Sequence, residues 1–184
     1  MGLSKFVYER ILGWKAHGDF AKDTIKKCIV IAVPHTSWHD FYMGLLLRSA
    51  LKTKIGFIGK KELFKFPFGY FFRAMGGAPI DRTSGQDKVM AIAHIFNTKD
   101  EFRLTLAPEG TRKKVTKLKT GFYYIALEAQ VPIIMVAFDF EKKEHRISKP
   151  LYPSGDIDTD LATIHQFFDG ALGKVPEYSF KTEV

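Results

Sequence analysis

The chain has 184 residues, of which 46% are hydrophobic and 26% charged, with 28 Lys and Arg against 20 Asp and Glu. This length is typical of one domain with a sizeable core, so we expect a single domain over residues 1–184. The net charge of +8 favours acidic partners: a phosphate-bearing substrate, an anionic lipid surface, an acidic carrier protein or a nucleic acid. The single cysteine, Cys28, excludes disulfides within the chain and favours a reducing compartment.

Helical and strand patterns alternate along the chain. Near the N-terminus, apolar side chains at helical spacing predict a helix over 4–17, within an amphipathic segment over 1–20. Further helices are predicted over 38–51, 86–98, 119–129 and 157–170. Strands are predicted at 28–33, 54–58, 78–80, 102–106, 131–138 and 146–148. This alternation predicts an α/β fold, a single domain with a mainly parallel central sheet flanked by helices.

No apolar run approaches the ~20 residues that a membrane-spanning helix needs. No secretory signal pattern opens the sequence. We therefore expect a protein without a transmembrane helix. No group of Cys and His has metal-ligand spacing, and no glycine-rich nucleotide loop occurs, so we expect neither a metal nor a cofactor.

The most informative motif directly follows the predicted strand at 28–33 and reads Pro34-His35-Thr36-Ser37-Trp38-His39-Asp40. His35 would lie at the carboxyl end of that strand and Asp40 in the first turn of the next helix, with Thr36 or Ser37 as its N-cap. An imidazole held by a carboxylate is the usual means of taking a proton from a hydroxyl near neutral pH. By itself, such a pair more often has a structural role. We interpret His39 as a packing residue.

Three more blocks follow in the sequence. They read Gly76-Gly77-Ala78-Pro79-Ile80-Asp81-Arg82, then Ala107-Pro108-Glu109-Gly110-Thr111-Arg112, then Val131-Pro132-Ile133-Ile134-Met135-Val136-Ala137-Phe138. With the His block they resemble, in order and spacing, the glycerolipid acyltransferase family typified by 1-acyl-glycerol-3-phosphate acyltransferase. The resemblance spans residues 28–138. His35 and Glu109 both follow predicted strands, at the sheet edge where α/β proteins collect their ligands.

The resemblance implies an acyl-thioester-dependent O-acyltransferase. His35 matches the catalytic histidine and would act as general base, and Asp40 matches the residue that orients it. The implied reaction moves a fatty acyl group from acyl-CoA or acyl carrier protein to the hydroxyl of a lysophospholipid. The preferred acceptor is 1-acyl-glycerol-3-phosphate, which would give phosphatidic acid. The thioester would be a co-substrate, and no cofactor is implied.

Four basic residues would recognise the phosphate or another anionic head group. Arg82 and Arg112 match the arginines of the second and third blocks, and guanidinium forks suit bidentate phosphate recognition. Lys60 and Lys61 would supplement this anion site. Further lysines cluster after the third block, at Lys113, Lys114, Lys117 and Lys119, and indicate a funnel for anions.

The remaining residues of the third block would support binding. Glu109 would orient one of the arginines or the Gly110-Thr111 turn. Gly110 would permit close backbone approach, and Thr111 could add a hydroxyl contact. Backbone amides near Gly110 are candidate donors to the oxyanion of the transition state.

Residues 64–73 contain six aromatic side chains around Pro67 and Gly69. Because so many rings are hard to bury in a small domain, we favour a lip that enters a bilayer interface or lines an acyl-chain channel over simple core packing. The N-terminal helix either packs on the sheet or lies in the interface, and the sequence leaves both open. We expect a peripheral protein on an anionic membrane surface, at the cytoplasmic face.

Two other functions stay open. The first is an O-acyltransferase for another lysolipid, such as a lyso-aminolipid, because the blocks do not fix the acceptor. The second is a non-catalytic basic protein that binds lipid or nucleic acid. That function leaves the His block and the Glu109–Arg112 block without a purpose, so we expect no nucleic-acid partner.

Overall fold

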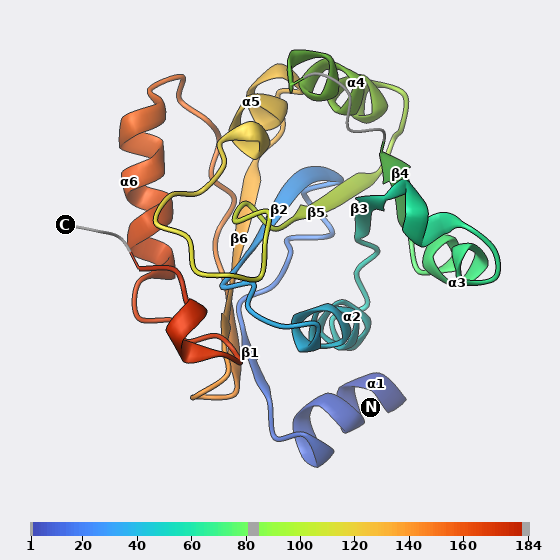
Figure 1. Ribbon diagram of the computed structural model, residues 1–184, viewed down its shortest axis with the longest axis vertical. Helices are drawn as coiled ribbons and strands as arrows, with labels where there is room; N and C mark the ends of the chain where they lie inside the picture. The colour runs from blue at the N-terminus through green and yellow to red at the C-terminus, as the bar shows by residue number, and fades with distance from the viewer. Residues whose placement is uncertain (1, 81–84, 182–184) are drawn as a thin grey trace.

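Within the residues that the structure describes, the protein is built on a seven-stranded sheet with the strand order β1-β7-β6-β2-β5-β3-β4. A computed structural model describes residues 2–80 and 85–181 (Figure 1). The strands are β1 (Lys15–His17), β2 (Lys27–Val33), β3 (Gly56–Lys60), β4 (Gly77–Ile80), β5 (Phe102–Leu106), β6 (Ile133–Asp139) and β7 (Glu144–Ile147). Only the pair β6–β7 is antiparallel among the described strand pairs, which confirms the predicted, mainly parallel α/β sheet.

Helices cover both faces of this sheet. They are α1 (Leu3–Phe6), α2 (His39–Ala50), α3 (Phe68–Ala74), α4 (Gly85–Asn97), α5 (Gly121–Glu128) and α6 (Ile157–Phe168), with the short π-helix η1 (Val7–Ile11) and the short 3₁₀-helices η2 (Lys61–Phe64) and η3 (Pro176–Tyr178). In Figure 1, α4, α5 and α6 lie on one side of the sheet and α1 and α2 on the other. Of these helices, α2, α4, α5 and α6 lie close to their predicted ranges.

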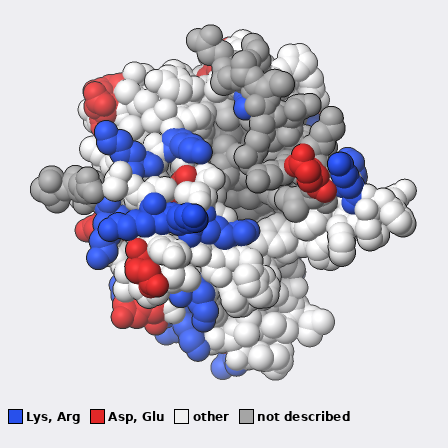
Figure 2. Space-filling view, viewed as in Figure 1, with Lys and Arg blue, Asp and Glu red and all other residues white. Residues whose placement is uncertain are grey.

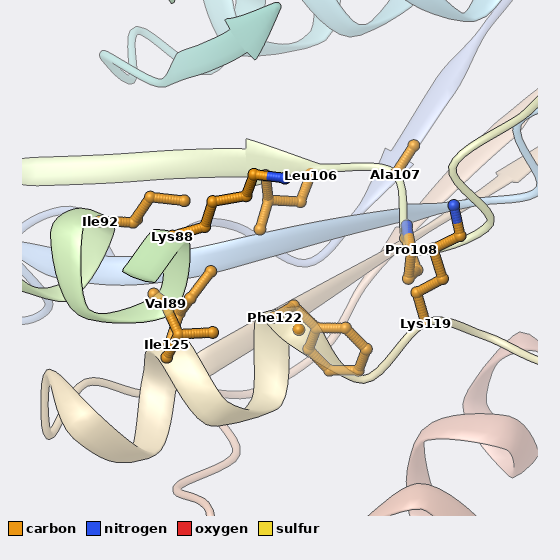
Figure 3. A pocket seen from close by; sticks show the side chains of 10 residues that line it. Lys88, Val89, Ile92, Leu106, Ala107, Pro108, Lys119, Phe122 and Ile125 are labelled. Atoms are coloured by element: carbon orange, nitrogen blue, oxygen red, sulfur yellow. The ribbon is translucent and has the colours of Figure 1, made fainter. Parts of the chain in front are cut away.

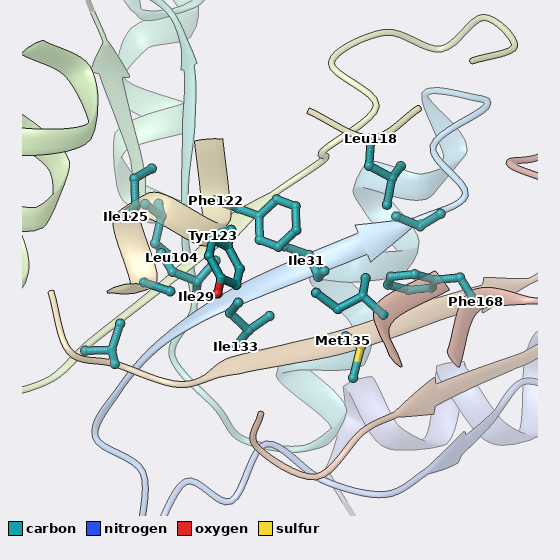
Figure 4. Packing of buried hydrophobic residues seen from close by; sticks show 14 of the residues in the cluster. Ile29, Ile31, Leu104, Leu118, Phe122, Tyr123, Ile125, Ile133, Met135 and Phe168 are labelled. Atoms are coloured by element: carbon teal, nitrogen blue, oxygen red, sulfur yellow. The ribbon is translucent and has the colours of Figure 1, made fainter. Parts of the chain in front are cut away.

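Alternation of side chains along β2 separates two cores, because successive residues of a strand point to opposite faces. Ile29 and Ile31 belong to the core under α4, α5 and α6, where Phe122 and Phe168 pack beside them (Figure 4). Cys28 belongs to the other core, under η1 and α2. A strand covered on both faces is apolar throughout, which explains the continuous apolar run that predicted it.

The helix of the N-terminal segment is shorter than the predicted range 4–17. Helical backbone ends at Ile11, Gly13 takes a φ of +71°, and the chain then forms the edge strand β1 beside β7. Tyr8 and Trp14 are buried in the core under α2, so the segment packs on the domain. Leu3, Phe6 and Ile11 nevertheless remain exposed.

The strand order brings the His block and the third block together. β2 lies between β5 and β6, and Ile31 of β2 pairs with Leu106, the last residue of β5. Since the strands are parallel, the loops that follow β2 and β5 leave the same edge of the sheet. His35 lies in the first loop and Glu109 in the second.

No helix within residues 2–80 and 85–181 combines the length and the hydropathy that a bilayer-spanning segment requires.

Candidate active site

His35 and Asp40 face each other across the loop that joins β2 to α2. The Nδ1 atom of His35 lies 3.1 Å from Oδ2 of Asp40, and the two side chains are 23% and 4% exposed. A proton on Nδ1 donates to the carboxylate and leaves the lone pair of Nε2 available. The pair therefore has the arrangement of an oriented base that a proton transfer from a hydroxyl requires.

The carboxylate of Asp40 also organises its own loop. Its Oδ2 accepts hydrogen bonds from the backbone N–H groups of Thr36 at 2.8 Å and Ser37 at 2.9 Å. The N-cap position is Trp38 and not Thr36 or Ser37, but Ser37 Oγ accepts a hydrogen bond from the backbone N–H of His39, the first residue of α2, at 3.3 Å. In addition, Asp40 in the first turn reaches back to the loop amides. Its other oxygen, Oδ1, has no hydrogen-bond partner among the described residues.

Thr36 fixes the same loop against the C-terminal segment. Its Oγ1 accepts a hydrogen bond from the backbone N–H of Val175 at 3.1 Å. A Cβ atom placed on Gly173 would come within 2.5 Å of this oxygen, so the approach depends on a glycine there. No local pattern in the sequence indicates a contact between residues so far apart.

Glu109 connects the third block to the His block. Its Oε2 accepts a hydrogen bond from the backbone N–H of His35 at 2.6 Å, and its side chain is 2% exposed. Burial raises the pKa of the Glu109 carboxyl to about 7, the negative charge of Asp40 adds to the rise, and the His35 amide opposes it. The sequence suggested that Glu109 orients an arginine or the next turn. In the structure it holds the backbone of the His loop.

The turn after Glu109 depends on Gly110, whose φ is +66°. Its backbone N–H donates to the carbonyl oxygen of Ala107 at 3.0 Å. This amide is therefore engaged within the turn and does not fit the expectation that it donates to an oxyanion. The side chain of Lys119 lies over the glycine, since a Cβ atom on Gly110 would approach Lys119 Nζ to 2.6 Å.

The other predicted anion-binding residues are placed as follows. Thr111 and Arg112 are exposed, in the loop that follows Glu109. Lys60 ends β3 and Lys61 begins η2, but their side chains lie outside what the structure describes. Arg82 lies outside the described residues.

An apolar cavity of about 240 Å³ opens beside the third block. It lies between α4, α5 and the end of β5, with Val89, Ile92 and Phe122 in its walls (Figure 3). Lys88 and Lys119 bring two ammonium groups to its lining, and Lys119 lies against Pro108 (Figure 3). The sequence motifs did not indicate this cavity, because most of its lining comes from α4 and α5, which lie outside the motif blocks.

Two further groups that could carry chemistry have structural explanations. Burial raises the pKa of the Cys28 thiol to about 12, so this buried cysteine is a poor nucleophile. His39 packs on Trp38 and Tyr42, and its Nδ1 lies 2.8 Å from Ser37 Oγ, which agrees with its interpretation as a packing residue. Among the described residues, no three His, Cys, Asp or Glu side chains are grouped as a metal ion would require.

Comparison with known proteins identifies the family. The model of the acyltransferase family matches residues 15–139. The human 1-acyl-sn-glycerol-3-phosphate acyltransferase beta is 27% identical over 142 residues, which are 74% of this chain and 50% of the human protein. The 1-acyl-sn-glycerol-3-phosphate acyltransferase of Streptococcus pneumoniae is 34% identical over 114 residues, which are 59% of this chain and 40% of that protein.

A solved structure supports the fold. The 1-acyl-sn-glycerophosphate acyltransferase of Thermotoga maritima superposes with a TM-score of 0.57 at 19% identity, covering 88% of this chain and 73% of the other. The chain spans half or less of the length of the curated relatives cited above. The family match covers well over half of the 184 residues and contains the His block, the third block and the strands that carry them, so the chain belongs to the acyltransferase family.

Proposed function

We propose that the protein transfers a fatty acyl group from an acyl thioester to the hydroxyl of a lysophospholipid, with 1-acyl-glycerol-3-phosphate giving phosphatidic acid. The observation that carries this proposal is the contact between His35 Nδ1 and Asp40 Oδ2 at the edge of the sheet. The acceptor is inferred from the relatives, which are named 1-acyl-sn-glycerol-3-phosphate acyltransferases.

The proposed chemistry needs no covalent enzyme intermediate. His35 Nε2 takes the proton of the acceptor hydroxyl while that oxygen attacks the thioester carbonyl. The tetrahedral oxyanion then collapses to an ester, and the leaving thiolate takes the proton back from the imidazolium. Asp40 stabilises the imidazolium cation and holds the ring in the correct tautomer. The thioester is consumed as a co-substrate, and the reaction calls for no further cofactor.

The acceptor phosphate is proposed to bind beside this pair, among the cations of the third block. Arg112 is exposed and Lys119 lies directly over Gly110, next to the residue that holds the His35 amide. Arg82, with Lys60 and Lys61, is assigned to the same anion site on the basis of the family motif. A guanidinium offers two parallel N–H donors to a phosphate, which an ammonium cannot.

The apolar cavity between α4 and α5 is proposed to hold an acyl chain. Its walls are mostly aliphatic and aromatic, and each methylene group that enters such a cavity contributes about 0.8 kcal/mol. Pro108 lines the cavity and immediately precedes Glu109. A chain in the cavity would therefore end close to the His loop.

We also propose that the protein works on an anionic membrane surface, at the cytoplasmic face. Phe66 and Tyr70 are 88% and 81% exposed, and Phe68 and Phe71 beside them are also exposed. Exposed aromatic groups of this size are typical of interaction surfaces. Lys65 and Arg73 lie at the two ends of this segment and could meet lipid head groups.

An assay of the purified protein tests the proposed function. Labelled acyl-CoA or acyl carrier protein is offered with a panel of lysolipids, and the products are resolved by mass spectrometry. We expect phosphatidic acid from 1-acyl-glycerol-3-phosphate, and its loss in His35→Ala. The matched control is His94→Ala, because His94 lies exposed on α4.

The same panel separates the other functions. A product formed only with a lyso-aminolipid would contradict the proposed acceptor but keep the chemistry. A protein without any transferase activity that still binds vesicles or polyanions would contradict the enzyme itself.

A further inference from the structure

A basic loop, defined as residues 110–119, follows the third block. Its five cations lie within eight successive positions and are all exposed: Arg112, Lys113, Lys114, Lys117 and Lys119. Among the side chains that the structure describes, none of the five has a carboxylate oxygen within 4.0 Å. Figure 2 shows Lys and Arg gathered over this part of the molecular face. Within the described part of the chain, the loop is therefore a surface of uncompensated positive charge.

The basic loop is anchored at both ends. The backbone N–H of Lys119 donates to the carbonyl oxygen of Pro108 at 2.8 Å, which closes the base of the loop. Leu118 is buried in the core under α4, α5 and α6, and Val115 packs against the same core. Compact surface loops whose ends are close are often functional. Its base adjoins Glu109, which accepts a hydrogen bond from the His35 backbone N–H, so the loop begins next to the segment that carries the proposed general base.

We propose that the basic loop is the docking surface for an acidic acyl carrier protein, which presents its thioester to His35. This inference rests on the proposed function, because it names the protein that carries the acyl donor. A carrier protein bears the thioester on a long flexible arm, so its acidic surface can contact the loop while the reacting carbon reaches the imidazole. Complementary charge on the two surfaces would raise the association rate and orient the carrier.

The shape of the basic loop favours a carrier protein over a nucleotide. A small ligand such as the nucleotide part of CoA binds in a concave site with converging polar groups. Neither the cavity beside Pro108 nor the one at α3 is lined by residues 111–117. The cations of the loop are instead spread over an exposed surface, as an acidic protein face would require.

The composition of the basic loop also distinguishes a carrier protein from a bilayer. Interfacial segments combine basic side chains with exposed apolar ones. None of the exposed large hydrophobic side chains lies in residues 107–120, whereas α3 exposes three and α1 exposes two. Attraction to an acidic protein needs only the charges that the loop supplies.

The test compares two thioesters with one charge-reversed variant. The triple substitution Lys113→Glu, Lys114→Glu and Lys117→Glu leaves Arg112 and Lys119 in place beside the proposed acceptor site. With acyl carrier protein as donor, we expect kcat/KM to fall by about 10-fold or more, and the wild-type value to fall as salt rises. With acyl-CoA as donor, we expect a clearly smaller fall in kcat/KM, because its phosphates respond to the local positive charge but its small head group does not span the docking surface.

The matched control carries the same change of net charge elsewhere. Lys22, Lys26 and Lys99 are exposed and precede β2 and β5, at the opposite end of the strands from His35. Replacement of all three by Glu should leave kcat/KM unchanged with either acyl donor. Circular dichroism and thermal unfolding check the fold of both variants, and if the loop triple does not fold, the single Lys114→Glu variant takes its place.

The outcomes separate this inference from the proposed function. An equal fall in kcat/KM with both thioesters, or no fall with either, would show that the basic loop does not dock a carrier protein. A wild type that uses acyl-CoA but not acyl carrier protein would show the same. If the loop triple instead loses binding to phosphatidylglycerol vesicles while its donor kinetics are unchanged, the loop contacts a bilayer and the inference is wrong. A wild type that is inactive with both thioesters would contradict the proposed function itself.

Discussion

Glu109 accepts a hydrogen bond from the backbone N–H of His35 at 2.6 Å, across 74 positions of the sequence. The contact is possible because β5 lies next to β2 in the sheet, so the loops after the two strands meet. Two of the four sequence blocks therefore form one structural unit. Glu109 acts on the loop that carries His35, and through it on the position of the imidazole.

If Glu109 positions His35, its loss should affect turnover more than acceptor binding. We expect Glu109→Ala to lower kcat by about 10-fold or more, since it leaves a partly buried N–H without its acceptor and frees the His loop. The KM for the lysolipid should change little. Glu109→Gln keeps a carbonyl oxygen as acceptor and should recover most of the rate. Steady-state kinetics with both variants would contradict this role if KM rises and kcat is unchanged.

The raised pKa of Glu109 predicts a specific dependence of stability on pH. Between its ordinary value of 4.5 and about 7, the native carboxyl keeps its proton while the unfolded one has lost it. The native state then binds more protons, so its stability relative to Glu109→Gln falls as pH rises through this range. The slope reaches up to about 1.4 kcal/mol for each pH unit. Denaturant unfolding of both proteins from pH 5 to 8 measures it, and a constant difference would refute the assignment.

Filling the apolar cavity should change the preferred acyl chain length. Val89 lines the cavity from α4, and Val89→Trp would occupy part of its 240 Å³. We expect the variant to prefer shorter acyl chains than the wild type, measured with a series of thioesters and lysolipids. Met90→Trp is the matched control, because Met90 is the next residue of the same helix and is exposed. A parallel change in both variants would show that the cavity does not hold the chain.

The exposed aromatic side chains around α3 should contribute to membrane binding. We expect the combined replacement of Phe66, Phe68, Tyr70 and Phe71 by Ser to weaken sedimentation with anionic vesicles while the protein stays folded. Tyr152 and Tyr178 are also exposed but lie in the C-terminal part of the chain, and their replacement by Ser is the control. If the first variant binds vesicles as well as the wild type does, the aromatic side chains around α3 do not contact the membrane.

The fold could be predicted where the sequence pattern is local. The apolar run of β2 predicts a strand buried on both faces, and the periodicity of α4 and α6 predicts their positions closely. The approach of His35 to Asp40 could also be inferred, because a strand-to-helix loop of five residues leaves few other arrangements. The helix predicted over 4–17 is longer than the observed one. Trp14 fits the helical spacing of apolar residues, but the helical backbone ends before Gly13, which takes a positive φ.

Contacts between distant parts of the chain could not be predicted in this way. Nothing near Glu109 indicates that its carboxylate holds the His35 amide, and nothing near Thr36 indicates Val175. The sequence also did not indicate which aromatic side chains of residues 64–73 are buried and which are exposed. Phe64 is buried and Phe72 packs on Phe57, while the other four aromatic side chains face solvent. These outcomes depend on which strands become neighbours, a property of the whole fold.

The central claim is that the imidazole of His35, oriented by Asp40, removes the proton of an acceptor hydroxyl. The most direct measurement is single-turnover acyl transfer from a thioester to 1-acyl-glycerol-3-phosphate by the wild type, His35→Ala and Asp40→Asn, with His94→Ala as control. We expect His35→Ala to lose about 100-fold or more in the rate of ester formation, and Asp40→Asn to lose a large part of it, with folding retained. A His35→Ala variant that forms the ester at the wild-type rate would contradict the account.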